Sequence, residues 1–576
     1  MRGIAELKLV GRLMAYAIRH QPNVVPIALV GILSSAAELG AVICLIPLGI
    51  VASGNPLSDH SLWMKVPHAL GMTPDPKFFI VLFLATWLFR MVSNMLALVL
   101  NGYVMQSLFA HFSIHAHASF VRHLPFSEII KHQIGHFFTL AGDEANRGAQ
   151  IVVGTIRIIP VIALFTAYAA FIFYQSWQAG IALAALAFAL GLVLKGVFRK
   201  ALRLGQRQQE ESRAANTLFF DSLGGLRTVR GFTAEDFVIS RYTRLTHNYV
   251  RTCFWGEALS HTTHLPFMIL IAGALGTIAF YADNIWLLAN MPLFFAVLMM
   301  LTRLMPMANY GLDIAMKLTS NLKAGRNVAD MLDAVSQSIE GNEHADFPIE
   351  EEIRQIVFDN VTFQYSNDTP PILQNFTCSL NAGHSYAITG PSGVGKSSLI
   401  DLLLKFYRPD SGTILVNGRD IAKLSAISLR RRMILAEQAT RIFYGSVLEN
   451  VQFDSDNSRQ AGEQALHLVG LDELLASLPQ GADTILAFQG NNFSGGQRQR
   501  IGLARAIVRD ADMLILDESI NALDFETRKR ILDNLLASYS DRIIVFVTHD
   551  PYVMERVDEI IELRSAEQIP QETAAE

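Results

Sequence analysis

The sequence GPSGVGKS spans residues 390–397, between a strand-like apolar run at 385–388 and a helix-like apolar run at 399–406. A glycine-rich loop in this strand–loop–helix setting binds phosphate groups. Its glycines let backbone N–H groups approach the phosphate oxygens, and the helix presents its positive N-terminal end to them. Lys396 is expected to neutralise the β and γ phosphates, and the Ser397 hydroxyl to bind Mg²⁺. The alternative, a chance glycine-rich turn, does not account for the flanking strand and helix.

An acidic pair follows a second strand-like run farther along the chain. Met513–Leu516 are four consecutive large apolar residues, and Asp517 and Glu518 come directly after them. At the end of a buried strand, Asp517 can reach a magnesium ion, while Glu518 can orient or deprotonate the attacking water. A surface acidic pair is the alternative, but surface strands do not usually carry four large apolar residues in a row. The two motifs together predict an α/β P-loop nucleotide-binding domain that hydrolyses ATP.

A second anion-binding motif lies between these two. Phe493–Gln497 (Phe-Ser-Gly-Gly-Gln) opens a helical run at 501–508. Its Ser hydroxyl, glycine backbone and helix N-terminus can together bind an anion. In this position, Ser-Gly-Gly-Gln resembles the signature of the ATP-binding cassette (ABC) family. The resemblance implies that the signature completes the site of the opposite subunit, so that two cassettes sandwich two ATP molecules.

The same resemblance assigns roles to further residues. Tyr365 resembles the aromatic residue that stacks on adenine, Gln438 the glutamine that contacts Mg²⁺, and His549 the switch histidine at the γ-phosphate. Asp524 ends an Asn-Ala-Leu-Asp sequence that resembles the loop crossing the dimer interface. The implied ATP-binding residues are Tyr365, Gly390, Pro391, Ser392, Gly393, Val394, Gly395, Lys396, Ser397, Ser398 and Gln438. The implied catalytic residues are Lys396, Asp517, Glu518 and His549. The implied Mg²⁺ ligands are Ser397, Gln438 and Asp517, and the implied signature residues are Phe493, Ser494, Gly495, Gly496 and Gln497.

The sequence departs from the family pattern at three places. Phe493 stands where Leu is usual, Ser519–Asn521 stand where Ala-Thr-Ser is commoner, and Phe488 stands where an acidic residue is usual. These changes leave the phosphate and water chemistry intact. They put the details of coupling between the cassette and the membrane domain in doubt.

The first part of the chain differs in kind from the cassette. Apolar residues make up 51% of the chain and charged residues only 17%. Stretches long enough to cross a bilayer, about 20 residues, occur near 23–53, 78–110, 150–175, 178–198, 262–282 and 286–306. Six crossings return both termini to the same side. The sequence therefore predicts an α-helical membrane domain of six transmembrane helices, and the long polar connections predict cytoplasmic extensions of these helices.

The basic residues predict the orientation of the spans. Eleven Lys and Arg residues lie between the fourth and fifth spans, from Lys195 to Arg251, whereas the opposite connections at 175–180 and 281–292 carry none. Loops rich in Lys and Arg face the cytoplasm. The cassette is thus expected in the cytoplasm, and we expect a multi-pass protein of the bacterial inner membrane. The net charge of −5 gives no reason to expect nucleic acid as a partner.

These patterns divide the chain into five segments. The predicted segments are an interfacial elbow helix (1–20), the six-helix transmembrane domain (21–335), a linker (336–352), the nucleotide-binding domain (353–564) and a polar tail (565–576). Spans followed by one cassette resemble the exporter branch of the ABC family, as a half-transporter. Because each chain carries one phosphate loop and one signature, we expect a dimer. A homodimer is favoured, and a heterodimer stays open.

Polar residues within or beside the spans are candidates for a substrate cavity. They are Glu38, Arg90, Asn94, Arg157, His261, His264, Arg303 and Asp313. A charge in mid-membrane costs about 2.5–3.5 kcal/mol or more, so these side chains are expected to face a cavity or one another. One reading is a site for a charged or amphipathic substrate. The other is pairing between helices, for instance of Glu38 with Arg90.

The sequence favours one function over a second. The favoured function is ATP-driven export or flipping, by alternating access in a dimer, of an amphipathic substrate such as a lipid, a lipid-linked glycan, a peptide or a hydrophobic drug. The alternative is an ATP-gated channel or sensor without active pumping. Glu518 argues against that alternative, because a channel that only binds ATP does not need a residue that activates water.

Overall fold

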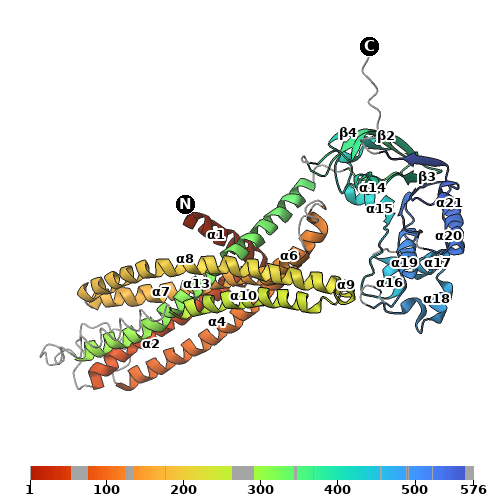
Figure 1. Cartoon of the computed structure of the whole chain (residues 1–576). Coiled ribbons are helices and arrows are strands. Elements are labelled where there is room, and N and C mark those ends of the chain that lie inside the picture. The colour runs from red at the N-terminus through yellow and green to blue at the C-terminus, as the bar shows by residue number, and fades with distance from the viewer. Residues whose placement is uncertain are drawn as a thin grey trace, which may run out of the picture. The chain divides into compact units, whose positions relative to one another are not determined.

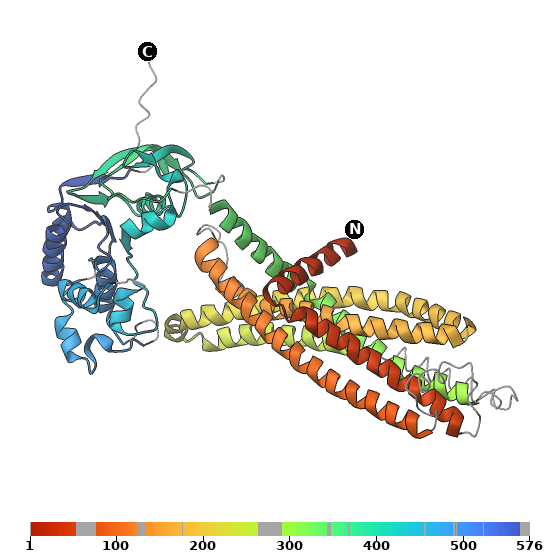
Figure 2. The same cartoon turned by 180° about the vertical axis from the view of Figure 1, so that it is seen from behind.

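The computed structural model divides the chain into two compact units (Figures 1 and 2). The first unit comprises Met1–Leu124 and Glu128–Ser338, and the second comprises Pro125–Ser127 and Ile339–Glu576. The structure describes residues 2–52, 76–124, 126, 129, 134–175, 177–262, 291–342, 347–366, 369–453, 457–487, 490, 492–521 and 523–564.

The described part of the first unit is helical. Its long helices are α1 (Arg2–His20), α2 (Val24–Ala52), α4 (Pro76–Ala118), α7 (Ala145–Gln175), α8 (Trp177–Gly224), α10 (Glu235–Thr262) and α13 (Met291–Asn342). Shorter helical segments are η1 (Ser119–His123), α6 (Ile134–Thr139), η2 (Leu140–Glu144) and α9 (Leu226–Gly231). At 1.5 Å per residue, helices α4, α8 and α13 are about 65 to 78 Å long, twice the thickness of the hydrocarbon core. They therefore continue past the membrane, as the sequence predicts.

Three described helical stretches are long and apolar enough to cross a membrane. They are Val24–Ala41, Lys77–Arg122 and Gly135–Ala170. Large apolar side chains of α4, among them Val81, Leu88 and Met95, are exposed on the surface of the unit. Exposed apolar side chains on a span suit contact with lipid tails, because such a surface would be unfavourable in water. Farther along the helices, Leu13, Phe112 and Ile151 join α1, α4 and α7 in one buried apolar cluster.

A buried carboxylate links helical segments next to this cluster. The side chain of Glu144, the last residue of the π-helical segment η2, is 0% exposed. Arg213 of α8 donates to its Oε1 atom at 2.9 Å, and Asn327 of α13 donates to its Oε2 atom at 2.8 Å. Both carboxylate oxygens are thus hydrogen-bonded, which a buried charge requires.

The second unit is built on two sheets. The antiparallel sheet has the order β2-β1-β4-β5, with strands β1 (Gln355–Phe363), β2 (Leu373–Asn381), β4 (Ser411–Val416) and β5 (Arg419–Asp420). The parallel sheet has the order β6-β7-β8-β3-β9, with strands β3 (His384–Thr389), β6 (Met433–Ala436), β7 (Met513–Asp517), β8 (Ile543–Val547) and β9 (Glu559–Glu562). Strand β1 is continuous but carries a bulge, at which Asn360 has a φ of +48°.

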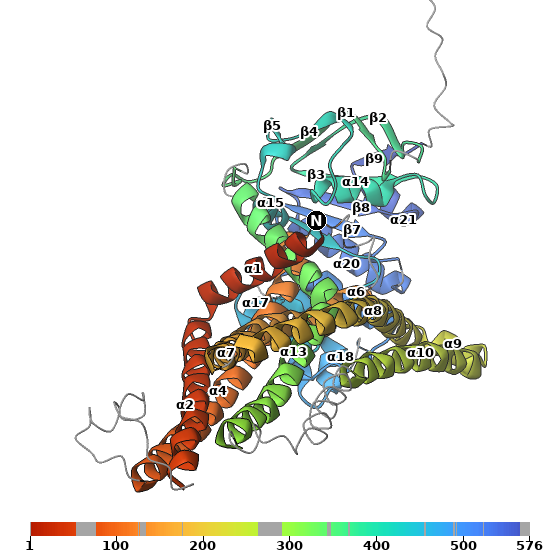
Figure 3. The same ribbon diagram turned by 90° about the vertical axis from the view of Figure 1, so that its left-hand side faces the viewer.

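The helices of this unit pack into two separate apolar cores. They are α14 (Lys396–Leu403), α15 (Ala426–Arg432), α16 (Val447–Gln452), α17 (Arg459–Leu468), α18 (Asp472–Ser477), α19 (Gly495–Ile507), α20 (Phe525–Ser538) and α21 (Pro551–Met554), with short turns η3 (Ile421–Lys423) and η4 (Gly481–Asp483). One core joins both sheets through Leu399 and Leu402 of α14, which lies between their strands in Figure 3. The other core contains Ile501 and Leu503 of α19. The predicted fold class, a helical membrane domain plus an α/β nucleotide-binding domain, is confirmed.

Helix α13 ends later than the sequence suggests. It continues to Asn342, so the first part of the segment 336–352 is helical rather than an irregular linker.

The buried hydrogen bonds of Glu144 lead to a prediction about stability. Glu144→Ala should lower the unfolding free energy by about 2–3 kcal/mol, because it leaves Arg213 and Asn327 without their buried acceptor. Glu210→Ala is the matched control, since Glu210 of α8 also pairs with α13, through Lys323, but its side chain is 67% exposed. That control should cost less than about 1 kcal/mol. Thermal unfolding of both purified variants measures the difference, and equal melting temperatures would contradict the prediction.

Candidate functional site

The phosphate loop is shaped by the elements on both sides of it. Strand β3 ends at Thr389, and α14 begins at Lys396. Gly395 has a φ of +110°, and a Cβ atom there would lie 2.6 Å from the side chain of Ile372. Gly390 has a φ of +146°, and its Cβ atom would lie 2.6 Å from the carbonyl oxygen of Leu563. Both positions therefore require glycine, for conformation and for space.

The loop curls around the ammonium group of Lys396. Lys396 Nζ donates to the carbonyl oxygens of Gly390 at 2.7 Å and of Pro391 at 3.1 Å. It also lies 3.1 Å from Nε2 of His549, which follows the neighbouring strand β8. The structure thus brings two of the predicted catalytic residues into direct contact.

The acidic pair lies at the same edge of the parallel sheet. Strand β7 ends at Asp517, and Glu518 follows with a φ of +46°. Gln438, which follows the adjacent strand β6, donates from Nε2 to Glu518 Oε2 at 2.7 Å. Burial and the neighbouring charge of Glu518 raise the pKa of Asp517 above its usual range, and Lys396 partly opposes this shift.

These residues fit a magnesium ion. A divalent cation beside Asp517 would offset the burial and repulsion that disfavour its ionised form. Ser397 is exposed at the start of α14, and Gln438 is exposed at the end of β6, so both offer oxygen ligands. Among the described residues, no group of three or more His, Cys, Asp or Glu side chains could hold a metal ion. Mg²⁺ does not need such a group, since it is usually bound by one or two protein ligands together with phosphates and water.

The predicted adenine-stacking residue lies just beyond β1. The Tyr365 hydroxyl is 3.0 Å from Ser398 Oγ and donates to Asp401 Oδ2 at 3.4 Å. Sequence reasoning did not single out Asp401. Its position one helical turn after Ser397 is the signal that could have identified it, because residues four apart share one face of a helix.

The signature begins helix α19 with a capping box. Ser494 accepts a hydrogen bond from the backbone N–H of Gln497, and the Gln497 side chain accepts one from the backbone N–H of Ser494. Ser494 and Gly495 are exposed. Phe493 is only 5% exposed and packs in the same core as Ile501. Phe493, which stands where Leu is usual in the family, is therefore accommodated in the apolar core.

The signature and the phosphate loop belong to different cores of the unit. Helix α14 contributes to one apolar cluster and α19 to the other, and the two helices lie apart in Figure 1.

Asp524, the predicted residue of the loop at the dimer interface, caps helix α20. Its carboxylate accepts a hydrogen bond from the backbone N–H of Thr527 at 3.0 Å, which lowers the pKa of the carboxyl group.

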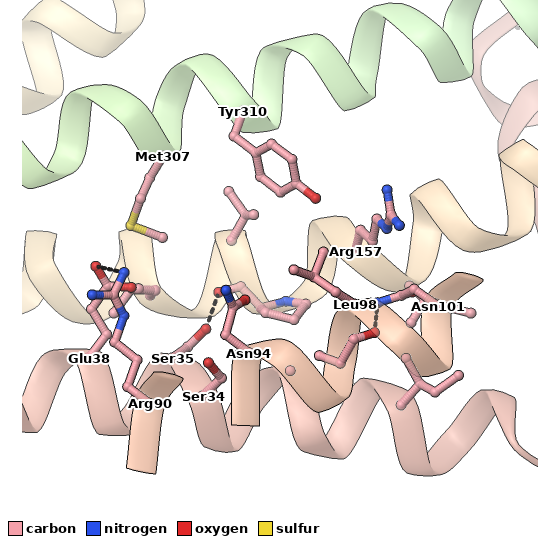
Figure 4. Close-up of a pocket in the computed structure, with 17 residues that line it drawn as sticks. Ser34, Ser35, Glu38, Arg90, Asn94, Leu98, Asn101, Arg157, Met307 and Tyr310 are labelled. Atoms are coloured by element: carbon pink, nitrogen blue, oxygen red, sulfur yellow. Dashed lines mark hydrogen bonds and ion pairs between the residues drawn. The ribbon is translucent and has the colours of Figure 1, made fainter. Parts of the chain in front are cut away.

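A cavity of about 300 Å³, lined by both polar and apolar side chains, lies among the membrane helices (Figure 4). Four of the eight candidate cavity residues line it: Glu38, Arg90, Asn94 and Arg157. Arg90 pairs with Glu38 at 3.2 Å. The pairing between helices that the sequence suggested is thus present, and it lies inside the candidate cavity.

Arg157 differs from Arg90 in having an unsatisfied donor. Its Nε atom is buried and makes no hydrogen bond with any described residue. The Oδ1 atom of Asn101, which also lines the cavity, is buried without a partner as well. Figure 4 shows Arg157 and Asn101 on one side of the cavity and Tyr310 and Met307 of α13 across from them.

The other candidates lie elsewhere or outside the description. Asp313 pairs with Lys317 at 2.8 Å and does not line the cavity. His264 lies outside the described residues, and only the backbone is described for His261 and Arg303. The cavity adds four polar residues that sequence reasoning missed, namely Ser34, Ser35, Asn101 and Tyr310. Their signal is helical spacing, since Ser34 precedes Glu38 by four residues and Asn101 follows Asn94 by seven.

Both units of the chain are similar to known proteins. The family model for the ABC transporter transmembrane region matches residues 60–282, and the model for the ABC transporter itself matches residues 373–521. An ATP-dependent lipid A-core flippase of Burkholderia orbicola (strain AU 1054) is 25% identical over 569 residues, covering 98% of this chain and 92% of the relative. The flippase of the same name from Syntrophus aciditrophicus (strain SB) is 29% identical over 401 residues, covering 69% of this chain and 66% of the relative.

A solved structure shares the fold over nearly the whole chain. The structure of a bacterial Atm1-family ABC exporter with ATP bound aligns with a TM-score of 0.76 and 23% identity. The alignment covers 95% of this chain and 94% of the exporter chain. It supports the fold of both units.

The buried position of Phe493 yields a prediction. Phe493→Leu should cost less than about 1.5 kcal/mol of stability and leave ATP hydrolysis unchanged, because a smaller apolar side chain still fills most of the site. Phe493→Ala should cost about 3–4 kcal/mol, because it leaves a cavity. Thermal unfolding and ATPase assays on both variants measure these effects. A loss of ATPase activity in the stable Leu variant would show that the Phe ring has a role beyond packing.

Proposed function

Because the chain belongs to the ABC transporters, with their transmembrane region and their ATP-binding domain in one polypeptide, we propose that it flips a lipid with an anionic headgroup across the bacterial inner membrane. The chain is an ATPase coupled to the movement of an amphipathic substrate through an integral membrane domain. Neither the family models nor the relatives support a nucleotide-gated channel. The proposal concerns the substrate, the membrane, the roles of the site residues and the partner subunit.

The buried Nε atom of Arg157, which has no hydrogen-bond partner among the described residues, carries the proposal for the substrate. A buried donor without an acceptor is costly inside a membrane. An anionic headgroup entering the cavity would supply the missing acceptor, with a charge-assisted hydrogen bond. Asn94 and Tyr310 add neutral hydrogen-bonding groups that suit the hydroxyl groups of a sugar. The relatives named as lipid A-core flippases fit a lipid substrate of this kind.

The nucleotide site supports hydrolysis through residues that share one sheet edge. Lys396 would leave the loop carbonyls for the β and γ phosphates, and His549 lies next to it at the γ-phosphate end. Ser397, Asp517 and Gln438 would hold Mg²⁺, which when bound neutralises the charge on the phosphate oxygens. Glu518 would orient or deprotonate the attacking water, and its hydrogen bond from Gln438 holds the carboxylate in place.

Two chains are needed for a complete site under this proposal. Ser494 and the N-terminus of α19 are exposed, and they belong to a different core from the phosphate loop of the same chain. A second copy could present its signature to that loop, and a two-fold axis would then form two equivalent sites. We propose a homodimer, because this chain retains all the residues that both sites would need.

The role of Glu518 has a direct test. Glu518→Gln should lower steady-state ATP hydrolysis at least about 100-fold, because an amide cannot accept a proton from water. ATP binding should survive, because the phosphate loop is untouched. Glu437→Gln is the control, since Glu437 is a nearby exposed carboxylate without an assigned role, and its turnover should stay near that of the wild type. Near-normal turnover in the Glu518 variant would remove Glu518 from its proposed role.

The role of Arg157 has a separate test in proteoliposomes. Arg157→Gln should abolish the stimulation of ATPase activity by lipids with anionic headgroups, while unstimulated activity persists. Arg157→Lys should retain part of the stimulation, because it keeps the charge. Lys317→Gln is the control, because Lys317 is a solvent-exposed cation on α13 whose side chain is 67% exposed. Equal stimulation of the wild type and Arg157→Gln would exclude an anionic headgroup at Arg157.

A further inference from the structure

The hydroxyl group of Tyr365 is anchored to the helix that begins at the phosphate loop. It lies 3.0 Å from Ser398 Oγ and donates to Asp401 Oδ2 at 3.4 Å. Ser398 is 3% exposed, so its hydroxyl group has a fixed position within the core. Asp401 lies three residues later in α14, on the same helix face.

Two other aromatic rings pack against the ring of Tyr365. The ring centroid of Phe363 lies 5.0 Å away at an interplanar angle of 77°, and that of Tyr407 lies 5.1 Å away at 82°. Both contacts are edge-to-face, the arrangement that aromatic quadrupoles favour. The side chain of Tyr365 is still 48% exposed, so part of the ring stays accessible to a ligand.

Asp401 depends on Tyr365 for its hydrogen bond. Burial raises the pKa of the Asp401 carboxyl group, and the hydrogen bond from Tyr365 lowers it. Among the described residues, no Lys, Arg or His side chain forms an ion pair with Asp401. A half-buried carboxylate without a cation needs a donor, and the Tyr365 hydroxyl provides one.

We propose that Asp401, together with Ser398, positions the Tyr365 ring for stacking on the base of the bound nucleotide. This inference rests on the proposed stacking of Tyr365 on adenine. Because Lys396, Ser398 and Asp401 all belong to α14, one rigid helix fixes both the phosphate loop and the base platform. A ring that is already oriented loses less conformational freedom when a base binds.

The test uses the full-length protein in proteoliposomes and a double-mutant cycle. Asp401→Ala and Tyr365→Phe should each raise the KM for ATP about 3- to 10-fold, the effect of losing one net hydrogen bond. The kcat should change less than about 2-fold, because neither side chain touches the reacting atoms. The double variant should have the KM of Tyr365→Phe alone, because that change already removes the hydrogen bond to Asp401.

Further variants separate this inference from the proposed role of Tyr365. Asp401→Asn keeps an acceptor oxygen and should restore most of the ATP affinity. If Tyr365→Ala leaves the KM unchanged, the stacking role itself is wrong. If Tyr365→Ala raises the KM but Tyr365→Phe and Asp401→Ala do not, only the positioning role is wrong. Additive effects in the double variant, or a loss of kcat at constant KM, would also overturn it. Thermal unfolding without nucleotide checks that each variant is folded.

Discussion

Strands β7, β8 and β3 pair in parallel, with Asp517 and Ile388 both level with Val547, and the nucleotide site depends on that register. Residues that leave the strands beyond this level emerge together at one edge of the sheet. The phosphate loop, Glu518 and His549 are such residues, although more than 150 positions separate the first from the last. A slip of one residue in any of the three strands would turn the buried side chains outward. Hydrophobic burial therefore holds the proposed catalytic groups in place.

The membrane unit contains two kinds of buried charged group, those with all their hydrogen-bond partners and one with an unsatisfied donor. Glu144 is fully enclosed and has partners on two other helices, so its function is structural. The cavity contains one satisfied pair, Glu38 with Arg90, and one cation with a buried, unsatisfied donor, Arg157. An incompletely satisfied polar group is costly unless a ligand completes it. The hydrogen-bond partners of a buried charged side chain therefore distinguish a structural role from a candidate binding role. The presence of the charge alone does not.

Local motifs made the ATP-binding domain predictable from the sequence. The loop at 390–397, the strand ending at Asp517 and the signature at Phe493–Gln497 each carry their chemistry within a few residues, and the comparisons confirm the family. The cavity could be predicted only in part, because the identity of its partners depends on how α2, α4 and α7 pack. Asp401 was missed, because its only local signal is its position four residues after Ser397, and its contact with Tyr365 forms where the end of β1 meets α14. The missed residues are thus those defined by tertiary contacts.

Helix α13 lines the candidate cavity with Met307 and Tyr310 and then runs unbroken to Asn342. No proline interrupts it over that distance of about 50 Å. A continuous helix resists stretching and twisting, because each backbone hydrogen bond would have to distort. A displacement of α13 at Asn342 would thus be carried along the helix to Tyr310, and it would also move the start of α7, because Asn327 of α13 is hydrogen-bonded to the buried Glu144. Two walls of the cavity, α13 and α7, would then shift together, and a force applied far from the cavity would weaken the binding of a headgroup.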